Sequence, residues 1–272
     1  GKHIRFTLTT NGLQLDGEKT KFLNEHMDNV IISLDGRRDV NDRLRKTPSG
    51  AGTYDLVLEN LQNFARDREG LYYVRGTYTS HNLDFAEDVR HLVRLGFKNV
   101  SVEPVVTGDD APYAIRGEHL PALLSEYERL ADFALEAEER GEPFSFFHFN
   151  IDLSQGPCAY KRAAGCGAGT EYVAVAPNGD IYPCHQFASE PDYLLGNVAD
   201  STFSNRLYAD FNRAHIFSKE VCRVCWARYY CSGGCHANAL HVNGDIMVPH
   251  EIGCILERKR IECAIGILAK RA

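Results

Sequence analysis

Hydrophobic and polar positions follow two different periods along the first 150 residues. Short runs rich in β-branched and aromatic residues, bounded by Gly, Asn or Asp, predict strands at 3–10, 29–33, 72–79, 99–106 and 144–149. Between these runs, apolar residues recur at helical spacing and predict helices at 17–27, after an N-cap at Thr53, between an N-cap at Asp84 and a stop at Gly96, and at about 118–140. Strands that alternate with helices in this way predict an α/β fold with a parallel sheet.

Polar residues stand at the carboxyl ends of four of the predicted strands, where parallel sheets usually carry their functional groups. They are Thr10 and Asn11, Ser33 and Asp35, Arg75 and Thr77, and Glu103. Asn11 and Asp35 also precede glycines, so a turn-forming role explains them equally well. Arg75 is also compatible with an exposed sheet face or a structural ion pair. Four strands with polar ends at one rim nevertheless favour a binding site.

After residue 155 the pattern changes, and Gly, Cys, Pro and Tyr punctuate the chain. The Pro177-Asn178-Gly179 turn between two short β-rich runs predicts a hairpin, with helices at 201–215 and 254–270. We therefore expect a domain boundary near 153–157, which separates a domain of residues 1–155 from a domain of residues 156–272.

Composition excludes several classes of protein. The 272 residues are 44% hydrophobic and 25% charged, as in ordinary soluble proteins. The formal net charge of −7 argues against nucleic acid as a partner, since phosphate binding needs clustered Lys and Arg. The longest late apolar run, at 264–269, is too short to span a bilayer, and the first residues lack the apolar core of a signal peptide. We therefore expect a cytoplasmic protein without membrane association.

The nine cysteines all lie after residue 157, which suggests a specialised role for this part of the chain. Their odd number and the absence of an export signal disfavour a disulfide framework. Cys222, Cys225, Cys231 and Cys235 follow the spacing C-x2-C-x5-C-x3-C, which is typical of metal binding. Zinc and cubane iron–sulfur clusters both take four thiolates. Eight cysteines with unequal gaps favour two polynuclear clusters, and a surface or neighbouring role is the commoner explanation for His185, His236 and His241.

The same cysteines carry a specific resemblance. Cys166-x12-Gly179-x4-Cys184, the C-x2-C-x5-C-x3-C run and Cys254 together resemble the seven-cysteine SPASM motif of radical S-adenosylmethionine enzymes. That resemblance implies two auxiliary [4Fe–4S] clusters. By position, the outer cluster is held by Cys222, Cys225, Cys231 and Cys254. The inner cluster is held by Cys166, Cys184 and Cys235, with Cys158 as the candidate fourth ligand or an open site in its place. Cys263 fits neither set, and we expect it to be a buried thiol of the last helix.

The first half agrees with this family. The segments FTLTTNG, VIISLDG, VRGTYTSHN and NVSVEPV resemble strands three to six of the barrel in peptide-modifying radical enzymes. The resemblance implies a partial (β/α)6 TIM-like barrel that lacks its first strands and ends with a bridging helix, followed by the SPASM domain with its small hairpin and helices. It also implies that Ser33 and Arg75 contact the ribose and carboxylate of S-adenosylmethionine, with Asn11 and Glu103 as weaker candidates. No catalytic residue is identified.

Two departures from the family pattern affect the expected activity. The C-x3-C-x2-C motif that binds the radical-generating third [4Fe–4S] cluster is absent, so we expect the chain as written to be inactive alone. The residue after Cys184 is His185, whereas the resembling sulfatase maturases have an Asp there that serves as a base. This difference weakens the interpretation as a sulfatase maturase.

Within the family, the segments GCGAGTEYVAV, GDIYPCHQF, CWARYYCSGGCHANA and HEIGC look most similar to the maturases of SCIFF peptides. The resemblance implies a maturase that forms Cys-to-Thr thioether bonds in a cysteine-rich ribosomal precursor peptide, exchanges electrons with a donor or acceptor protein, and works in an anaerobic host. The alternatives are another SPASM chemistry, such as sulfatase maturation or epimerisation, and a non-catalytic iron–sulfur or zinc protein.

Overall fold

The computed structural model describes residues 2, 4–152, 163–188 and 190–272. The chain divides into two compact units. The sheet unit comprises residues 1–105, 115–150 and 263–272, and the cysteine-rich unit comprises residues 106–114 and 151–262. The predicted α/β fold with a parallel sheet is confirmed. The boundary expected near 153–157 falls mostly outside the described residues.

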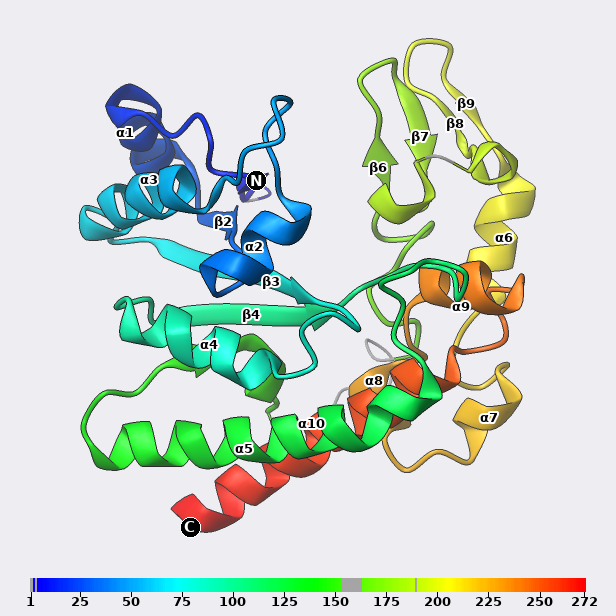
Figure 1. The fold of residues 1–272 in the computed structure, drawn as a ribbon. Coiled ribbons are helices and arrows are strands. Elements are labelled where there is room, and N and C mark those ends of the chain that lie inside the picture. The colour runs from blue at the N-terminus through cyan, green and yellow to red at the C-terminus, as the bar shows by residue number, and fades with distance from the viewer. Residues whose placement is uncertain (1, 3, 153–162, 189) are drawn as a thin grey trace. The chain divides into compact units, whose positions relative to one another are not determined.

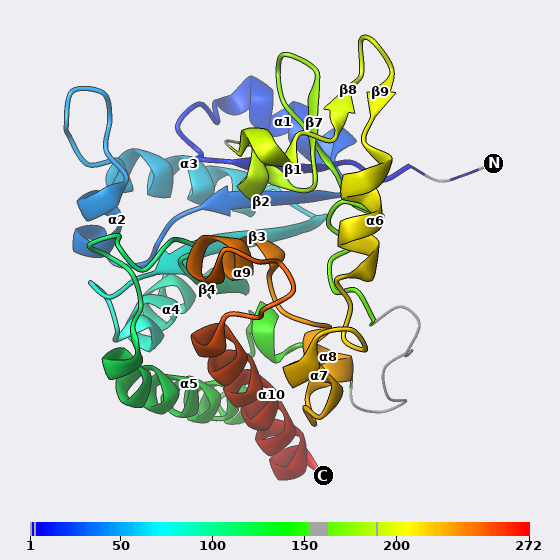
Figure 2. The same ribbon diagram turned by 90° about the vertical axis from the view of Figure 1, so that its right-hand side faces the viewer.

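The sheet unit is built on five parallel strands in the order of the chain (Figures 1 and 2). They are β1 (Thr7–Thr10), β2 (Asn29–Ser33), β3 (Leu71–Tyr78), β4 (Asn99–Pro104) and β5 (Ser145–Phe146). Each strand pairs with the next one, and Figure 2 shows β1 to β4 side by side. The last predicted strand is shorter than expected, because residues Phe147–Phe149 turn into a 3-10 helix whose rings pack on Phe146.

The helices of this unit are α1 (Gly17–His26), α2 (Arg38–Leu44), α3 (Tyr54–Arg66), α4 (Phe85–Arg94) and α5 (Leu120–Glu139), with a 3-10 turn at Gly117–His119. Alternate strand residues such as Val30, Val74 and Val100 are completely buried and form the core with α3, α4 and α5. Right-handed crossovers place the helices on one face of a parallel sheet. The other face of each strand therefore keeps the polar side chains.

The helix starts differ from the predicted caps. Thr53 and Asp84 do occupy the N-cap positions, but neither side chain caps its helix. Instead, Asp42 Oδ1 accepts hydrogen bonds from the backbone N–H groups of Thr53 and Tyr54, at 2.9 and 2.8 Å. Asp84 is drawn away by Arg37, whose Nη2 lies 2.8 Å from Asp84 Oδ1. Helix α2 supplies Asp42 and was not predicted, since its sequence is mostly polar.

Two small layers form the cysteine-rich unit. A four-stranded antiparallel sheet contains β6 (Ala174–Val175), β7 (Asp180–Tyr182), β8 (Gly196–Asn197) and β9 (Thr202–Phe203). The β6–β7 pair confirms the predicted hairpin, and Gly179 in its turn has a φ of +88°, which favours glycine. The strands β8 and β9 are two residues each and gave no sequence signal. Two 3-10 turns, His185–Phe187 and Pro191–Tyr193, lie between β7 and β8. After β9 come the helices α6 (Asn205–Arg213), α7 (Glu220–Arg223), α8 (Arg228–Cys231) and α9 (His236–Asn243).

A compact apolar cluster holds the cysteine-rich unit together. Phe187 and Phe211 are buried with rings in edge-to-face contact, 5.4 Å between centroids, and Cys184 and Ala237 belong to the same cluster. Edge-to-face aromatic pairs add to the burial energy of both rings. Because Cys184 packs within this cluster, the core and the cysteine arrangement depend on the same residues.

The last helix, α10, runs over Glu251–Arg271 and begins earlier than predicted, so that Cys254 lies in its first turn. Its end belongs to the sheet unit, where Lys270 Nζ lies 3.2 Å from Asp132 Oδ1 on α5 and Arg271 pairs with Glu138. Cys263 is only 7% exposed on this helix, as expected for a buried thiol.

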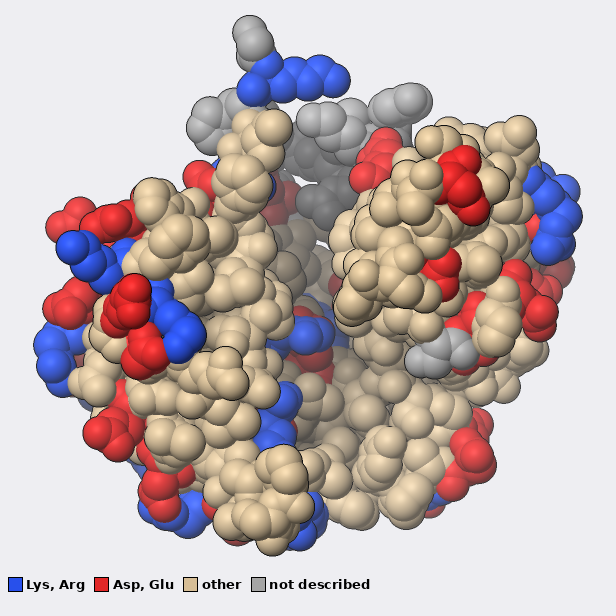
Figure 3. All heavy atoms as spheres, turned by 90° about the horizontal axis from the view of Figure 1, so that it is seen from above, with Lys and Arg blue, Asp and Glu red and all other residues tan. Residues whose placement is uncertain are grey.

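Surface charge and hydropathy agree with the composition. In Figure 3, Lys and Arg side chains lie among Asp and Glu side chains, and the described residues form no continuous basic surface on that face. Among the described helices, none has both the length and the apolar character needed to cross a membrane.

Two leucines on α3 provide a test of the predicted core. Leu61 is completely buried, whereas Leu56 is 49% exposed. We expect Leu61→Ala to lower the free energy of unfolding by about 2–5 kcal/mol through lost burial and a residual cavity. Leu56→Ala should cost less than about 1 kcal/mol, because Leu and Ala have similar helix propensities. Urea denaturation followed by circular dichroism measures both, and equal losses would contradict this packing.

Candidate cofactor and metal sites

Several of the polar residues predicted at the strand ends do share one face of the sheet. Ser33 pairs in register with Arg75, Arg75 with Ser101, and Thr77 with Glu103. Residues paired in a parallel sheet point to the same face, and this face is opposite the buried valines. The structure therefore brings Ser33, Arg75 and Glu103 together, as the strand pattern predicted.

Arg75 and Glu103 form a two-pronged ion pair across β3 and β4. Arg75 Nε lies 3.1 Å from Glu103 Oε1, and Nη2 lies 2.5 Å from Oε2. The hydrogen bonds to Glu103 raise the pKa of the Arg75 guanidinium, so it stays charged. Ser101 Oγ donates to Glu103 Oε1 at 3.1 Å, and His148 Nε2 lies 3.9 Å from the same oxygen. The structural ion pair, which was one of the alternatives for Arg75, is therefore present. His148 is a neighbour of Glu103 that the sequence did not reveal.

The two residues that precede glycines have local structural partners. Asp35 is 4% exposed and accepts hydrogen bonds from Arg45 Nε at 2.6 Å and from the backbone N–H of Thr77 at 2.9 Å. Gly76 lets this segment approach closely, since a Cβ there would meet Asp35 Cα at 3.0 Å. Asn11 Oδ1 accepts from the N–H of Leu13 at 3.2 Å, as in an Asx turn. The turn-forming interpretation of Asn11 is therefore observed, and its role in cofactor binding stays a prediction.

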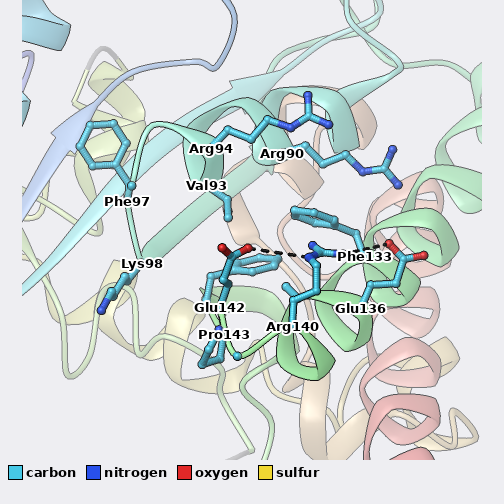
Figure 4. A pocket seen from close by; sticks show the side chains of 14 residues that line it. Arg90, Val93, Arg94, Phe97, Lys98, Phe133, Glu136, Arg140, Glu142 and Pro143 are labelled. Atoms are coloured by element: carbon cyan, nitrogen blue, oxygen red, sulfur yellow. Dashed lines mark ion pairs between the residues drawn. The ribbon is translucent and has the colours of Figure 1, made fainter.

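A cavity near the sheet lies at its opposite edge. It has a volume of about 1150 Å³ and is lined by the end of α4, the segment before β4 and the loop between α5 and β5 (Figure 4). Two of its arginines have partners: Arg140 lies 3.7 Å from Glu136 and from Glu142, and Arg90 stacks 5.2 Å from the ring of Phe133. This amino-terminal edge usually serves stability in such sheets, and the cavity is not our candidate site.

In the cysteine-rich unit, seven described cysteines fall into two electrostatic neighbourhoods. Cys184 has charge interactions with Cys166 and Cys235. Cys254 has charge interactions with Cys222 and Cys225, and Cys231 has one with Cys254. The first group spans three separate segments, and the second reaches from α7 and α8 to the start of α10. These groups have the same members as the described part of the inner and outer sets that the resemblance implied, and their roles as cluster ligands stay predictions. Cys158 lies outside the described residues, and its role stays a prediction.

Three of the thiols occupy turns in which backbone N–H groups face the sulfur. The N–H groups of Gln186 and Phe187 act to lower the pKa of Cys184, and that of Phe187 also donates to the Cys184 carbonyl at 3.0 Å. The N–H groups of Ala237 and Asn238 act in the same way on Cys235, and those of Gly233 and Gly234 on Cys231. Both glycines have positive φ angles, of +98° and +73°. Each thiol therefore faces the N–H groups two and three residues later. Such hydrogen bonds to sulfur stabilise thiolates and influence cluster potentials.

Burial controls the protonation of these thiols in the protein alone. It raises the pKa of Cys184, Cys222 and Cys254, and it raises the pKa of Cys231 to about 12. Thiol ligands lose their protons when a metal centre binds, so binding is linked to proton release. All seven side chains are thiols, a donor set that suits iron–sulfur clusters. In the described ranges, no three His, Cys, Asp or Glu side chains are arranged to hold one metal ion.

The neighbouring histidines have other contacts. His236 is 3% exposed and stacks on Phe211 with centroids 5.6 Å apart, and burial lowers its pKa to about 4. His241 Nδ1 lies 3.8 Å from Glu190 Oε1, and His185 Nδ1 lies 3.4 Å from the hydroxyl of Tyr172. These positions suit the neighbouring roles that the sequence favoured. A residue that the sequence did not single out is Lys219, which is 1% exposed beside the cysteines.

Comparison with known proteins supports the cysteine-rich unit first. Residues 166–226 match the model of the SPASM family, described as an iron-sulfur cluster-binding domain. The match starts at Cys166 and includes Cys184, Cys222 and Cys225. A SPASM domain is therefore present in this part of the chain.

Similar curated proteins are maturation enzymes. The serine-type anaerobic sulfatase-maturating enzyme of Bacteroides thetaiotaomicron is 24% identical over 90% of this chain and 64% of its own length. The mycofactocin maturase MftC of Mycobacterium ulcerans is 28% identical over 86% of the chain and 63% of its own length. The chain thus spans slightly less than two thirds of these relatives.

A solved structure, native anSMEcpe with bound AdoMet, covers 98% of the chain with a TM-score of 0.77 and 22% identity, and 74% of that structure is matched. The same protein with bound AdoMet and the Kp18Cys peptide gives a TM-score of 0.76 at 22% identity, over 98% of this chain and 75% of the other. At this identity the similarity shows the fold. The chain therefore shares the fold of anSMEcpe.

The grouping of cysteines can be tested by counting iron. We expect anaerobically reconstituted protein to hold about eight irons per chain, and Cys231→Ala to hold about four, because one of two cubanes loses a ligand. Cys263→Ala is the matched control and should retain the full iron content, since that thiol lies outside both sets. Unchanged iron in the Cys231→Ala variant would contradict the assignment.

Proposed function

We propose that the cysteine-rich unit binds two auxiliary [4Fe–4S] clusters. The observation that carries this proposal is the separation of the thiols into two neighbourhoods, one with Cys166, Cys184 and Cys235 and one with Cys222, Cys225, Cys231 and Cys254. The SPASM match over residues 166–226 supports it independently. Backbone N–H groups directed at Cys184, Cys231 and Cys235 would stabilise the thiolates of bound clusters.

We further infer that the polar face of the sheet binds S-adenosylmethionine. Ser33, Arg75 and Glu103 share this face, and Arg75 keeps a charged guanidinium suited to a carboxylate. In this proposal Glu103 fixes the orientation of Arg75, and Asn11 lies at the end of β1 as the weaker contact. The bound AdoMet in anSMEcpe, whose fold this chain shares, supports the proposal.

Together these sites support a role in a peptide-modifying radical enzyme. S-adenosylmethionine, with the third cluster, would supply a 5′-deoxyadenosyl radical. The sheet residues would hold and orient the cofactor, and the cysteine sets would hold the clusters through which an electron passes to or from a partner protein. The relatives named as maturases support a peptide or protein substrate. Oxygen-sensitive centres of this kind suit the cytoplasm of an anaerobic host.

For the reaction itself we propose thioether formation in a cysteine-rich, SCIFF-type precursor peptide. The Cα–H bond of a peptide Thr breaks and its hydrogen atom leaves with 5′-deoxyadenosine. The thiol of a peptide Cys loses its proton, and a bond forms between sulfur and Cα with release of one electron, which clusters held by the two cysteine sets would accept. An inner set with three described cysteines leaves room for a substrate thiolate as a ligand, unless Cys158 takes that place. Such ligation would hold the sulfur close to the radical carbon.

The substrate assignment is tested with the complete gene product that contains this chain and a candidate precursor peptide. We expect a product lighter than the precursor by two hydrogen atoms, in which one Cys no longer reacts with a thiol reagent. Mass spectrometry measures both. An oxidised side chain without a crosslink would instead indicate sulfatase-type maturation, for which His185 in place of an Asp is unfavourable. An unchanged mass with an inverted centre would indicate epimerisation.

The cofactor site is tested by Arg75→Met in the same complete protein. Loss of a hydrogen bond between charged groups costs about 1.5–3 kcal/mol, so we expect S-adenosylmethionine to bind at least about tenfold more weakly. Arg38→Met, which removes an exposed guanidinium paired with Asp55, is the matched control and should bind normally. Calorimetry under anaerobic conditions gives the affinities.

Glu103→Gln distinguishes cofactor contact from a purely structural ion pair. This variant keeps the guanidinium of Arg75 but removes the charge of its partner. A smaller loss of affinity than in Arg75→Met supports direct contact by Arg75. Normal affinity in Arg75→Met would overturn the assignment.

A further inference from the structure

Lys219 is a lysine with almost no access to solvent. Lys219 is 1% exposed and occupies the N-cap position just before α7. Lysine is rarely buried unless a counter-charge accompanies it, because removing an ammonium group from water is costly. Burial lowers the pKa of the Lys219 ammonium group, and the charges of four cysteines oppose this shift and favour the charged form: Cys222, Cys231, Cys254 and Cys235.

The backbone and the side chain both fix the position of Lys219. Its carbonyl accepts hydrogen bonds from the N–H groups of Cys222 and Arg223, at 3.0 and 3.2 Å. Its Nζ donates to the carbonyl of Gly233 at 2.9 Å. Gly233 lies between Cys231 and Cys235, so the side chain ties the segment before the C-x2-C pair to the turn that carries the other two thiols. Among the described residues, Gly233 supplies the hydrogen-bond acceptor of Nζ, and an ammonium group has two further N–H bonds to donate.

The four cysteines belong to both neighbourhoods. Cys222, Cys231 and Cys254 are members of the outer set, and Cys235 is a member of the inner set. Thiolate-bound clusters carry net negative charge, and their reduction potentials depend on charge, hydrogen bonds and solvent exposure. A positive charge that is held in a poorly screened interior acts more strongly on a cluster than one in water.

We propose that Lys219 is a counter-charge shared by the two clusters, which raises the reduction potential of both and of the outer one more. This inference rests on the proposed cluster function. The ammonium group stabilises the additional electron of each reduced cluster, and its larger number of outer-set neighbours makes the outer cluster the better electron acceptor. Lys219 is thus a tuning residue, which holds no metal and contacts no substrate.

Three variants test the proposal: Lys219→Met, Lys219→Arg and Arg223→Met. Lys219→Met removes the charge and keeps the length of the side chain, whereas Lys219→Arg keeps a positive charge. Arg223 is exposed and lies between Cys222 and Cys225 in the sequence. Arg223→Met is the matched control, because it removes a solvated positive charge that is also close to these cysteines in the sequence. Each protein is loaded with iron and sulfide anaerobically, and the clusters are titrated with a reductant while electron paramagnetic resonance is recorded.

We expect Lys219→Met to shift both potentials downward, with the larger shift for the outer cluster, and we expect wild-type potentials in Lys219→Arg and Arg223→Met. Wild-type potentials in a fully loaded Lys219→Met protein would overturn the proposal. If Lys219→Met fails to hold clusters, the Lys219→Arg variant tests the proposal in its place. Two clusters at wild-type potentials in Lys219→Arg would support a role for the positive charge. Lost clusters or shifted potentials in Lys219→Arg would oppose it. Failure of the wild-type protein to take up iron and sulfide would instead refute the cluster function itself, before any variant is compared.

Discussion

Thiol side chains are short, so they can share a metal centre only where the backbone is bent to gather them and to balance their charge. This constraint shapes the whole cysteine-rich unit. Cys184, Cys231 and Cys235 each face N–H groups two and three residues later. The glycines at 233 and 234 permit one of these bends through their positive φ angles. Phe187 and Phe211 form the apolar cluster that keeps Cys184 in place, so the packing of this small unit and its chemistry depend on each other.

The sheet unit meets a different constraint. Right-handed crossovers gather α3, α4 and α5 on one face of the parallel sheet, and the opposite face is left for polar side chains. There, the register of β2, β3 and β4 places Ser33, Arg75 and Glu103 on a common surface. The ion pair between Arg75 and Glu103 holds a planar guanidinium in a defined orientation, which is what recognition of a carboxylate requires.

The sequence was informative where a local pattern reflects a local structure. The five parallel strands and the hairpin at Gly179 follow from hydrophobic periodicity and turn residues. The sequence did not reveal contacts in which the partner residue lies far away along the chain. Asp42 replaces Thr53 as the cap of α3, and Arg37 engages Asp84 instead of leaving it to cap α4. No local pattern distinguishes Lys219 from the many exposed lysines, because its burial depends on the folding of the cysteine segments around it.

Binding of two separate iron–sulfur clusters is tested most directly by anomalous diffraction at the iron absorption edge, from crystals grown and frozen without oxygen. We expect two iron centres, one beside Cys222, Cys225, Cys231 and Cys254 and the other beside Cys166, Cys184 and Cys235. A single centre, or a signal at the zinc edge with none at the iron edge, would contradict it.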